Sequence, residues 1–594
     1  MNTLHRYLQK TFLWWYDPLP TTIRQQQQDD DDNNNKNNAT NATSFVVTDA
    51  AMPETPEEAM ELLLLQKRKH NNTQTQTQTQ TQTHLFPPSF LWGAATAAYQ
   101  TEGGLHHCNW SEWEQQQQQH GHKQERAGKA CDSWNLFESK DLQHLQELGV
   151  TVYRFSVDWS RVEPTQGQFD DKAIQRYQSW CQKLQAANIE PMITLHHFTE
   201  PAWFTRMGGW EDRNNLQYFE RFVQTVGQAL ASHHCRYWTT VNELNGYAVC
   251  GWLAGVHPPG KVNDVLGMLR VVRHLLVAHT MASKAIRASS ASRNKGQDPV
   301  ICMALNHVYF LPFFEQNNKT SNSDNNPLQE NHRWWWFLHW QQLLRVVPTF
   351  INKILSSLVS LFLNYVYNFV ILDALFSPQH AGRFPIFPFP FHIVATLAGW
   401  GDDLRALKGT ADWIGINHYY RSYVQFFANR QHDTQSHDQQ HRQASPTDMF
   451  VALPFGIELR ASAMDHFEKN EMGWDVTPSS MERLIQILWD RYQPIPMIIT
   501  ESGTADATDR QRVRYIAAIL YMLRNKLLLQ RQSNAIDIRG YLIWTLMDNF
   551  EWAEGYKPKF GLLETNFDTT ASSLERKERT WTCNLLRQVF PKDS

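Results

Sequence analysis

The sequence predicts an α/β protein built on a single (β/α)8 barrel. From Phe86 onward, runs with strand character alternate with runs of helical periodicity. The strand-like runs number eight, as a closed barrel of this type requires. A doubly wound parallel sheet is the alternative fold, but no glycine-rich phosphate-binding loop follows any of these runs. In a (β/α)8 barrel the active site lies at the carboxyl ends of the strands.

The eight strands are predicted from apolar or alternating segments. They lie at 89–99, 150–160, 190–198, 237–244, 299–310, 411–420, 496–503 and 538–550. Two of the intervening segments place apolar residues on one helical face. The first face holds Ile174, Tyr177, Cys181 and Leu184, and the second holds Met481, Leu484, Ile485 and Leu488.

Low-complexity segments and insertions surround the barrel pattern. Residues 1–85 contain Gln, Asn and Asp tracts that cannot bury enough apolar surface to offset chain entropy, so a largely disordered N-terminal region is expected. A short helix is expected within that region, at 53–69. The barrel domain then spans 86–592, with an apolar insertion at about 330–375 and a polar loop at about 425–448.

The apolar insertion contains a charge-free run, 354–372, that is about as long as a membrane span. An aromatic cluster at 333–340 precedes it. A span here would interrupt the barrel between two strands, so a helix of the barrel is favoured. Contact with a membrane surface through about 334–372 stays open as an alternative. The polar residues that lower the hydrophobicity of the run are Ser356, Ser357, Ser360, Asn364 and Asn368.

Composition and charge argue against several classes of function. The formal net charge is −4 with both signs interspersed, so nucleic acid is not expected as a partner. The seven cysteines show no CxxC or Cys/His spacing, which indicates free thiols in an intracellular, cytoplasmic setting. No metal ion and no cofactor is expected. The 42% of hydrophobic residues suffices for a large core, and the 23 Trp are typical of proteins that handle carbohydrate.

Two glutamates occupy matching positions at the ends of predicted strands. Glu243 follows the fourth strand, in TTVNEL, and Glu501 ends the seventh, in IITESG. Burying a carboxylate costs free energy unless it is paired. A single glutamate at a strand end is usually structural, but two on nearly opposite strands can face each other across the barrel mouth. Such a pair, one protonated and one ionised, is what cleavage of a glycosidic bond needs.

Six blocks stand out along the chain: FLWGAATAAYQTEGG, YRFSVDWSRVEP, TVNEL, IGINHYY, ITESG and GYLIWTLMDNFEWAEGYKPKFGL. In this order they resemble the blocks of glycoside hydrolase family 1, the β-glucosidase and β-galactosidase family of retaining enzymes. The resemblance covers 86–592, and its last block is highly specific. It implies a β-glycosidase that acts on a small-molecule β-glycoside.

The resemblance implies roles for four residues at a catalytic centre. Glu243 matches the family's general acid/base, and Glu501 matches the nucleophile that forms the glycosyl-enzyme. Arg154, in YRFS, matches the arginine that pairs with the nucleophile, and an adjacent cation keeps a carboxylate ionised. Tyr419, in NHYY, matches the tyrosine whose hydroxyl contacts the nucleophile. Glu243 must be protonated in the free enzyme and must then act as a base.

The resemblance also implies a complete sugar-binding subsite. Trp544 matches the indole beneath the sugar ring, and Glu551 and Trp552 match the pair that binds the far hydroxyls. An acidic residue at 551 would repel phosphate, so an unphosphorylated β-glucoside, β-galactoside or β-fucoside is expected. The residues that match contacts to the other hydroxyls are Gln100, His197, Asn242 and Asn417.

Three residues depart from the family pattern. Leu244 replaces a proline after the acid/base, Ser502 replaces an asparagine after the nucleophile, and Phe198 replaces a tryptophan after His197. None of them removes a proton-transfer group or the nucleophile. They are expected to alter rate or aglycone choice, and the sequence alone gives no interpretation of Ser502.

Two other functions could use the same residues. A membrane-associated transglycosylase would form the same intermediate and pass the sugar to an alcohol, and the apolar stretch 334–372 motivates this alternative. A non-catalytic sugar-binding protein is less favoured, because it has no need of two costly carboxyl groups. The sequence does not predict the aglycone, which variable loops select, the choice of glucose over galactose, or the oligomeric state.

Overall fold

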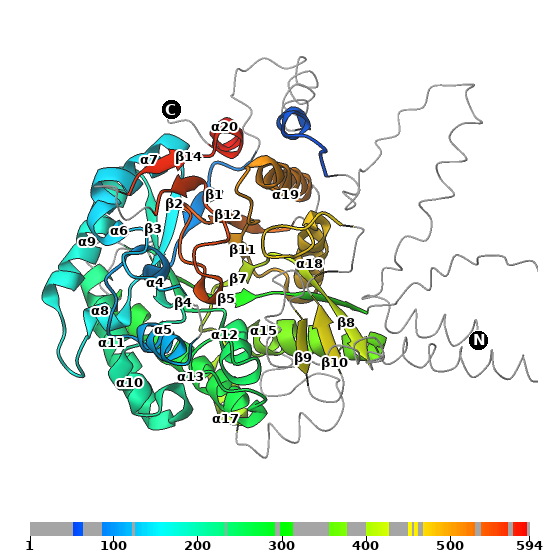
Figure 1. The fold of residues 1–594 in the computed structure, drawn as a ribbon. Coiled ribbons are helices and arrows are strands. Elements are labelled where there is room, and N and C mark those ends of the chain that lie inside the picture. Colours follow the sequence, from blue (N-terminus) through cyan, green and yellow to red (C-terminus); the bar gives the residue numbers. More distant parts are fainter. Residues whose placement is uncertain are drawn as a thin grey trace, which may run out of the picture. The chain divides into compact units, whose positions relative to one another are not determined.

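The computed structural model describes residues 52–62, 86–121, 125–231, 235–290, 298–312, 356–360, 362–376, 400–426, 450–453, 457–460, 462, 467–528, 536–567 and 574–590. These residues contain a closed barrel of parallel strands with helices around it (Figure 1). Each barrel strand lies inside one of the predicted runs, so the (β/α)8 prediction is confirmed. The strands are β1 (Leu91–Ala95), β2 (Val152–Ser156), β3 (Glu190–His196), β4 (Tyr237–Asn242), β5 (Val300–Asn306), β7 (Trp413–Asn417), β11 (Met497–Ser502) and β12 (Ile538–Trp544).

Helices form the outer layer and bury the faces that the sequence predicts. All four predicted residues of α18 are buried, and so are those of α9 except Ile174, which is half-buried. Local signals start both helices, because the Asp170 carboxylate caps α9 and Pro478 occupies the first turn of α18. The longer helices are α5 (Asn109–Gln119), α9 (Asp171–Ala186), α11 (Leu216–Ala231), α13 (Val265–Ser289), α18 (Pro478–Tyr492), α19 (Arg510–Leu528) and α20 (Thr580–Val589). Short ones include α4 (Ala98–Thr101), α7 (Leu142–Leu148), α12 (Leu244–Ala248), α15 (Val370–Phe376) and α17 (Gly401–Ala406).

A second, smaller sheet extends from the carboxyl ends of β5 and β7. Its strand order is β6-β8-β10-β9, with β6 parallel to β8 and antiparallel pairing among the others. A two-stranded sheet of β13 and β14 lies near the C-terminus. The bounds are β6 (Tyr309–Pro312), β8 (Arg421–Phe426), β9 (Phe450–Leu453), β10 (Ile457–Arg460), β13 (Leu563–Thr565) and β14 (Arg576–Glu578).

An apolar layer closes the amino end of the barrel. Six strands each contribute one buried side chain, all but Leu542 from the amino-terminal half of the strand, and full burial of such a side chain stabilises the fold by about 1.5–3 kcal/mol. Polar side chains lie beyond this layer, at the carboxyl ends of the strands. The six residues are Leu91, Val152, Met192, Tyr237, Ile498 and Leu542.

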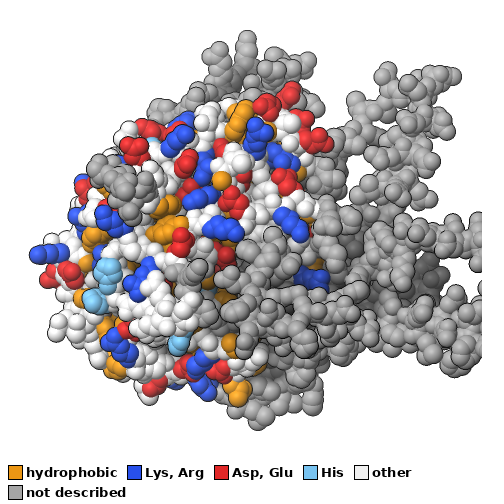
Figure 2. Space-filling view, in the orientation of Figure 1, with side chains coloured by type: hydrophobic (Ala, Val, Ile, Leu, Met, Phe, Trp, Pro, Cys, Tyr) orange, Lys and Arg blue, Asp and Glu red, His pale blue; other side chains and the backbone are white. Residues whose placement is uncertain are grey.

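Charges of both signs are intermixed over the face of the molecule shown in Figure 2. Many form ion pairs, such as Arg213 with Asp403 at 2.7 Å and Arg273 with the same carboxylate at 2.7 Å. Exposed pairs of this kind each contribute at most about 1 kcal/mol. The intermixing agrees with the interspersed charges of the sequence.

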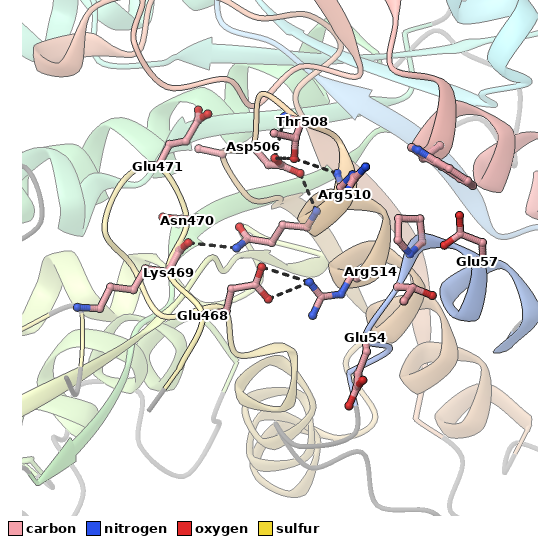
Figure 3. A pocket seen from close by; sticks show the side chains of 15 residues that line it. Glu54, Glu57, Glu468, Lys469, Asn470, Glu471, Asp506, Thr508, Arg510 and Arg514 are labelled. Atoms are coloured by element: carbon pink, nitrogen blue, oxygen red, sulfur yellow. Dashed lines mark hydrogen bonds and ion pairs between the residues drawn. The ribbon is translucent and has the colours of Figure 1, made fainter. Parts of the chain in front are cut away.

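A short helix precedes the barrel, over 56–62, inside the predicted range 53–69. Thr55 caps it, since its Oγ1 accepts from the Glu58 N–H at 3.1 Å. Arg514 of α19 fastens the segment by donating from Nε to the Pro53 carbonyl at 2.5 Å. A cavity of about 630 Å³ lies between this segment, the 468–471 loop and the start of α19. Figure 3 shows side chains that line it. The rest of 1–85 lies outside the described residues.

The apolar run is helical where it is described, from 356 to 376 with residue 361 left out. Its carboxyl-terminal part is a π turn, Tyr365–Phe369, followed by α15. Asp373 anchors α15 to α18 through a two-pronged ion pair with Arg491. The polar residues Ser356, Ser360, Asn364 and Asn368 are buried, whereas Leu358 and Phe362 are 50% and 38% exposed. The aromatic cluster 333–340 and the polar loop beyond 426 lie outside the described residues.

Two described helices are long and apolar enough to cross a membrane by length and composition alone. They are Val265–Ser289, which is α13, and Ser356–Phe376. In their most apolar windows, 50% and 56% of the residues are buried inside the protein. This burial is typical of helices that pack on a core, and α13 contacts both α11 and β4.

Candidate active site

The polar ends of β4 and β11 place Glu243 and Glu501 in one buried cluster. Glu501 lies in β11, and its side chain is only 4% exposed. Arg154 of β2 donates from Nη1 to Oε1 at 2.5 Å, and the Tyr419 hydroxyl donates to Oε2 at 2.7 Å. Each oxygen of Glu501 therefore has a strong donor, one of which is a cation.

Among the described residues, the hydrogen-bond donors that hold Glu243 are neutral. It follows β4 in the left-handed region, with φ 45° and ψ 47°, immediately before α12. Asn306 donates from Nδ2 to Oε2 at 3.0 Å, and Asn417 donates from Nδ2 to Oε1 at 2.9 Å. Burial, followed by the charge of Glu501, raises the pKa of Glu243 to about 7. A large fraction of Glu243 is therefore protonated near neutral pH.

The two carboxyl groups differ in which one gives up its proton first. Burial also raises the pKa of Glu501, but Arg154 and the Tyr419 hydroxyl oppose that rise directly. The charge of Arg154 also lowers the pKa of Glu243, but it acts there from further away and has a weaker effect. Glu501 is therefore the group that ionises first, because the cation touches it.

Asn242 and Asn417 join the two carboxyl groups into one network. The Asn242 Oδ1 accepts from Arg154 Nη2 at 2.7 Å and from Asn417 Nδ2 at 3.1 Å. The Asn417 amide acts on both Glu243 and Glu501, and lowers the pKa of each. Glu243 and Glu501 thus lie on either side of the same asparagine.

His197 presents a free N–H donor to the site. Because Oδ1 of Asn242 faces Arg154, its Nδ2 must point to His197 Nε2, at 3.2 Å. Burial and the charge of Arg154 lower the pKa of His197 well below its usual value, so the ring is neutral. Its proton then sits on Nδ1, which is buried without a hydrogen-bond partner among the described residues.

Gln100 of α4 offers the complementary group. Its Nε2 donates to the Phe550 carbonyl at 2.8 Å and to Glu551 Oε2 at 3.2 Å. Its Oε1 is buried and has no partner within the described part of the chain. Buried polar atoms in proteins are almost always paired, so this acceptor and the His197 donor indicate a polar ligand.

The side of the site that holds His197 and Gln100 also contains Trp544, Glu551 and Trp552. His197 stacks on both indoles, with ring centroids 5.8 Å from Trp544 and 6.1 Å from Trp552. Burial raises the pKa of Glu551 to about 8, and a hydrogen bond from Trp544 limits the rise. All eleven residues singled out from the sequence therefore meet at the carboxyl end of the barrel.

Ser502 points away from the site. Glu501 faces the barrel mouth, where Arg154 and Tyr419 contact it, whereas Ser502 faces the helices outside. Its Oγ lies 3.0 Å from the Tyr515 hydroxyl of α19. The replacement at this position therefore concerns packing between β11 and α19, not the chemistry.

Leu244 and Phe198 lie closer to the chemistry. Proline disfavours helical geometry in the residue before it, so Leu244 removes a constraint on the left-handed conformation of Glu243. Phe198, also at positive φ, packs 5.1 Å from Trp552 and 5.8 Å from Tyr247 between ring centroids. It keeps the aromatic wall and lacks an indole N–H.

Sequence reasoning missed four polar residues that hold the cluster. Thr194 Oγ1 accepts from Arg154 Nε at 3.0 Å, and Thr500 Oγ1 donates to Asn417 Oδ1 at 2.7 Å. Asn306, which touches Glu243, ends β5 just as Asn242 and Asn417 end β4 and β7. This repeated asparagine at strand ends was the available signal for Asn306. The fourth residue, Asn245, lies on α12 and gives no such signal.

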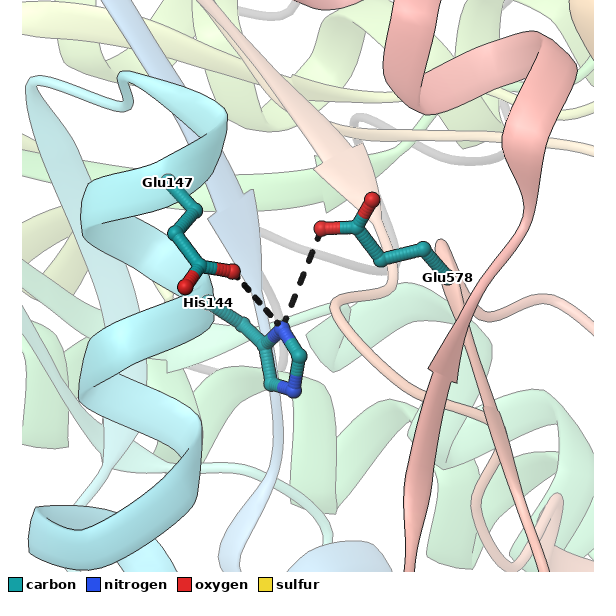
Figure 4. Close-up of side chains that lie close together, drawn as sticks. All are labelled: His144, Glu147 and Glu578. Carbon is teal, nitrogen blue, oxygen red and sulfur yellow. Dashed lines mark ion pairs between the residues drawn. The ribbon is translucent and has the colours of Figure 1, made fainter.

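A separate cluster of titratable groups lies outside the barrel mouth (Figure 4). His144 Nδ1 on α7 lies 3.5 Å from Glu147 Oε2 and 3.9 Å from Glu578 Oε1. Arg587 also pairs with Glu578. Because α7 leads into the amino end of β2, the cluster lies at the end of the barrel opposite the active site. Its arrangement is that of a surface ion-pair network.

The barrel, with two buried carboxyl groups at strand ends and a polar wall beside them, defines a glycoside-cleaving enzyme. The family model for glycosyl hydrolase family 1 matches residues 82–356 and 369–588, and the chain belongs to this family. It is accordingly a retaining β-glycosidase.

Relatives of known activity support this assignment. The chain is 26% identical over 499 residues to a 1,4-β-D-glucan glucohydrolase of Thermotoga neapolitana, covering 82% of this chain and 98% of that one. It is 26% identical to the human cytosolic β-glucosidase, covering 82% and 94% of the two chains. A β-glycosidase structure from Pyrococcus horikoshii matches with a TM-score of 0.61 and 26% identity, over 86% of this chain and 96% of that one.

Proposed function

We propose that Glu501 is the nucleophile and Glu243 the general acid/base in hydrolysis of terminal, unphosphorylated β-glucosides, β-galactosides or β-fucosides. The observation that supports this most directly is the difference between their partners. A cation and a phenol donate to Glu501, whereas in the described part of the chain the side chains that donate to Glu243 are carboxamides. The first arrangement favours an ionised nucleophile, and the second favours a carboxyl that keeps its proton.

The proposed reaction has two steps. Glu501 attacks the anomeric carbon while Glu243 gives its proton to the glycosidic oxygen, so the C–O bond breaks and the aglycone leaves. Glu243, now ionised, takes a proton from water as the water oxygen attacks the glycosyl-enzyme. The sugar is released with retained configuration, Glu501 is free again and Glu243 is again protonated. Arg154 and Tyr419 orient the Glu501 carboxylate throughout.

The sugar subsite follows from the unpaired polar atoms. We assign the glycone hydroxyls to Gln100 Oε1, His197 Nδ1 and the Glu551 carboxyl, which all belong to the cluster described above. Asn242 and Asn417 reach the same space from β4 and β7. A phosphorylated sugar would bring a dianion close to ionised Glu501 and would oppose ionisation of Glu243 and Glu551, which is unfavourable.

The proposed catalytic domain comprises 86–592, separate from residues 1–85. An intracellular location is part of the proposal, supported by seven cysteines, none of which forms a disulfide in the described structure, and by the name of the human relative. The apolar stretch gives less support to a membrane-associated transglycosylase than the sequence did, since the polar side of its described part is buried and bonds the main chain of Val308 and Phe310.

Hydrolysis of nitrophenyl β-glycosides by Glu243→Ala and Glu501→Ala tests the assignment. Each variant should lose most activity, about a hundredfold or more for the acid/base. Azide should restore turnover in Glu243→Ala and give a β-glycosyl azide, whereas Glu501→Ala should give the α-azide. Azide products of the opposite configuration would exchange the two roles, and wild-type activity in Glu501→Ala would refute the proposal.

A further inference from the structure

Three asparagine side chains bracket alternate residues of the segment 306–310. Each carboxamide accepts from the main-chain N–H of one residue and donates to the carbonyl of that same residue. This is the pair of bonds that a neighbouring β-strand would provide. The pairs are Asn245 on Asn306, at 3.2 and 2.7 Å; Asn368 on Val308, at 3.2 and 2.8 Å; and Asn364 on Phe310, at 3.1 and 2.7 Å.

The spacing explains how a helix can replace a strand here. Four residues of an α-helix rise by about 6 Å, and two residues of a strand rise by about 6.6 Å, so positions i and i+4 of one match positions i and i+2 of the other. Asn364 and Asn368 have this spacing, beside Phe310 and Val308. On its other side β6 pairs with β8. The helix therefore covers the edge of the smaller sheet.

The bracketed segment leads directly to Glu243. Asn306 holds Glu243 Oε2 with its side chain, at 3.0 Å, and its own main chain is held by Asn245. Asn368 then fixes Val308, two residues further on. Asn245 Nδ2 also lies 3.3 Å from the Tyr367 carbonyl, which joins α12 to the helix. A continuous set of hydrogen bonds thus runs from the helix to the carboxyl group.

We propose that Asn245 and Asn368 are positioning residues for Glu243, which fix the main chain of 306–308 so that Asn306 keeps its amide on Oε2. The inference rests on the proposed role of Glu243 as acid/base. The family model matches 82–356 and 369–588, so Asn364 and Asn368 lie between the two matched stretches. A single π turn, Tyr365–Phe369, lies at the contact, as π turns often do at functional sites.

Loss of the Asn306 amide has a defined effect on protonation. The amide stabilises ionised Glu243, so its displacement raises the pKa of Glu243 and moves the alkaline limb of the pH profile of kcat/KM upward. Other groups that act on Glu243, or feel its charge, are not themselves substituted in such variants. They are Glu501, Arg154, Asn417, Cys250, Tyr367, Tyr419, Tyr420 and Glu551.

The test compares Asn245→Ala, Asn368→Ala and Asn364→Ala on a nitrophenyl β-glycoside across pH. The first two should move the alkaline limb upward, by up to about one unit if the Asn306 contact is lost, with a fall in kcat. Asn364→Ala is the matched control, because it removes the same kind of contact from Phe310, which lies two residues further from Asn306 than Val308 does. It should lower the melting temperature and leave the limb in place.

If Asn368→Ala does not fold, the pH profile of Asn368→Ser is measured in its place, because serine is neutral and keeps a polar side chain. The inference is overturned if the alkaline limb of the pH profile stays at its wild-type position in Asn245→Ala and in a folded Asn368 variant. It is also overturned if Asn364→Ala moves that limb by as much as they do. Glu243→Ala with azide is run beside them. If azide does not restore its activity, the proposed role of Glu243 fails; if it does and the limb is unmoved, only the positioning role fails.

Discussion

Replacing Glu501 by glutamine should lower the pKa of Glu243. The pKa of the Glu243 carboxyl is raised from 4.5 to about 7. Burial and the negative charge of Glu501 are the two largest causes of this rise. At 1.36 kcal/mol per unit, that rise corresponds to about 3 kcal/mol of preference for the neutral form. Glutamine removes the second cause and leaves the first.

The size of the change follows from the charges that remain. Arg154 contacts Glu501 at 2.5 Å and keeps its positive charge when the partner becomes neutral. Ionised Glu243 then faces an uncompensated cation in place of an ion pair, so both effects act in the same direction. We expect the pKa of Glu243 to fall by about one unit or more. The same fall in the glycosyl-enzyme, where Glu501 is esterified, would turn Glu243 into a base.

Carbon-13 NMR of protein labelled at the glutamate side-chain carboxyl measures this directly, by titration between pH 4 and 9 with Glu243→Gln to assign the signal. Glu578→Gln, in the ion-pair cluster at the other end of the barrel, is the matched control and should leave the titration unchanged. An unchanged or higher pKa in Glu501→Gln would mean that burial alone sets the protonation of Glu243. The reasoning above would then be refuted.

Three further changes separate chemistry from packing. Ser502→Ala should leave kcat/KM at the wild-type value and cost about 1–2 kcal/mol in urea unfolding, because it removes the partner of the buried Tyr515 hydroxyl; a large loss of activity would contradict its outward orientation. Glu551→Gln should lower kcat/KM for a nitrophenyl β-glucoside by about ten- to a hundredfold. It should also improve the relative rate on the 6-phosphate above pH 8, because the Glu551 carboxyl, whose pKa is about 8, ionises there and glutamine cannot; an unchanged ratio of the two substrates at that pH would remove Glu551 from glycone recognition. Asn364→Ala should lower the unfolding free energy by about 2–6 kcal/mol, because the N–H and the carbonyl of Phe310 each lose a partner; a loss below 1 kcal/mol would show that water replaces the carboxamide.

The barrel and its two glutamates could be predicted because both depend on local patterns. Each strand is a short apolar run, and a strand end fixes which residues reach the barrel mouth. Ser502 had no such signal, because β11 shifts register after Ile499 and the side chains of both Thr500 and Glu501 reach the polar cluster. Asn306, by contrast, had a signal, in the asparagine that ends three of the barrel strands.

The smaller sheet and the asparagine contacts could not be predicted in this way. β8, β9 and β10 pair across loops, and their partners depend on where the chain returns after β7. Asn364 and Asn368 are far along the chain from Val308 and Phe310, and nothing in either segment specifies the pairing. From sequence, the two asparagines only make an apolar run less apolar.

The same polar residues have the opposite meaning once the buried face is known. Ser356, Ser360, Asn364 and Asn368 recur every fourth residue and form one buried stripe. To move this helix into a bilayer would unpair the N–H and carbonyl groups of Val308 and Phe310, at about 1–3 kcal/mol for each group. It would also separate Asp373 from Arg491 and place four polar side chains in hydrocarbon. The polar side of the described part of the apolar run therefore holds it to the enzyme. Leu358 and Phe362, on the other side, are exposed.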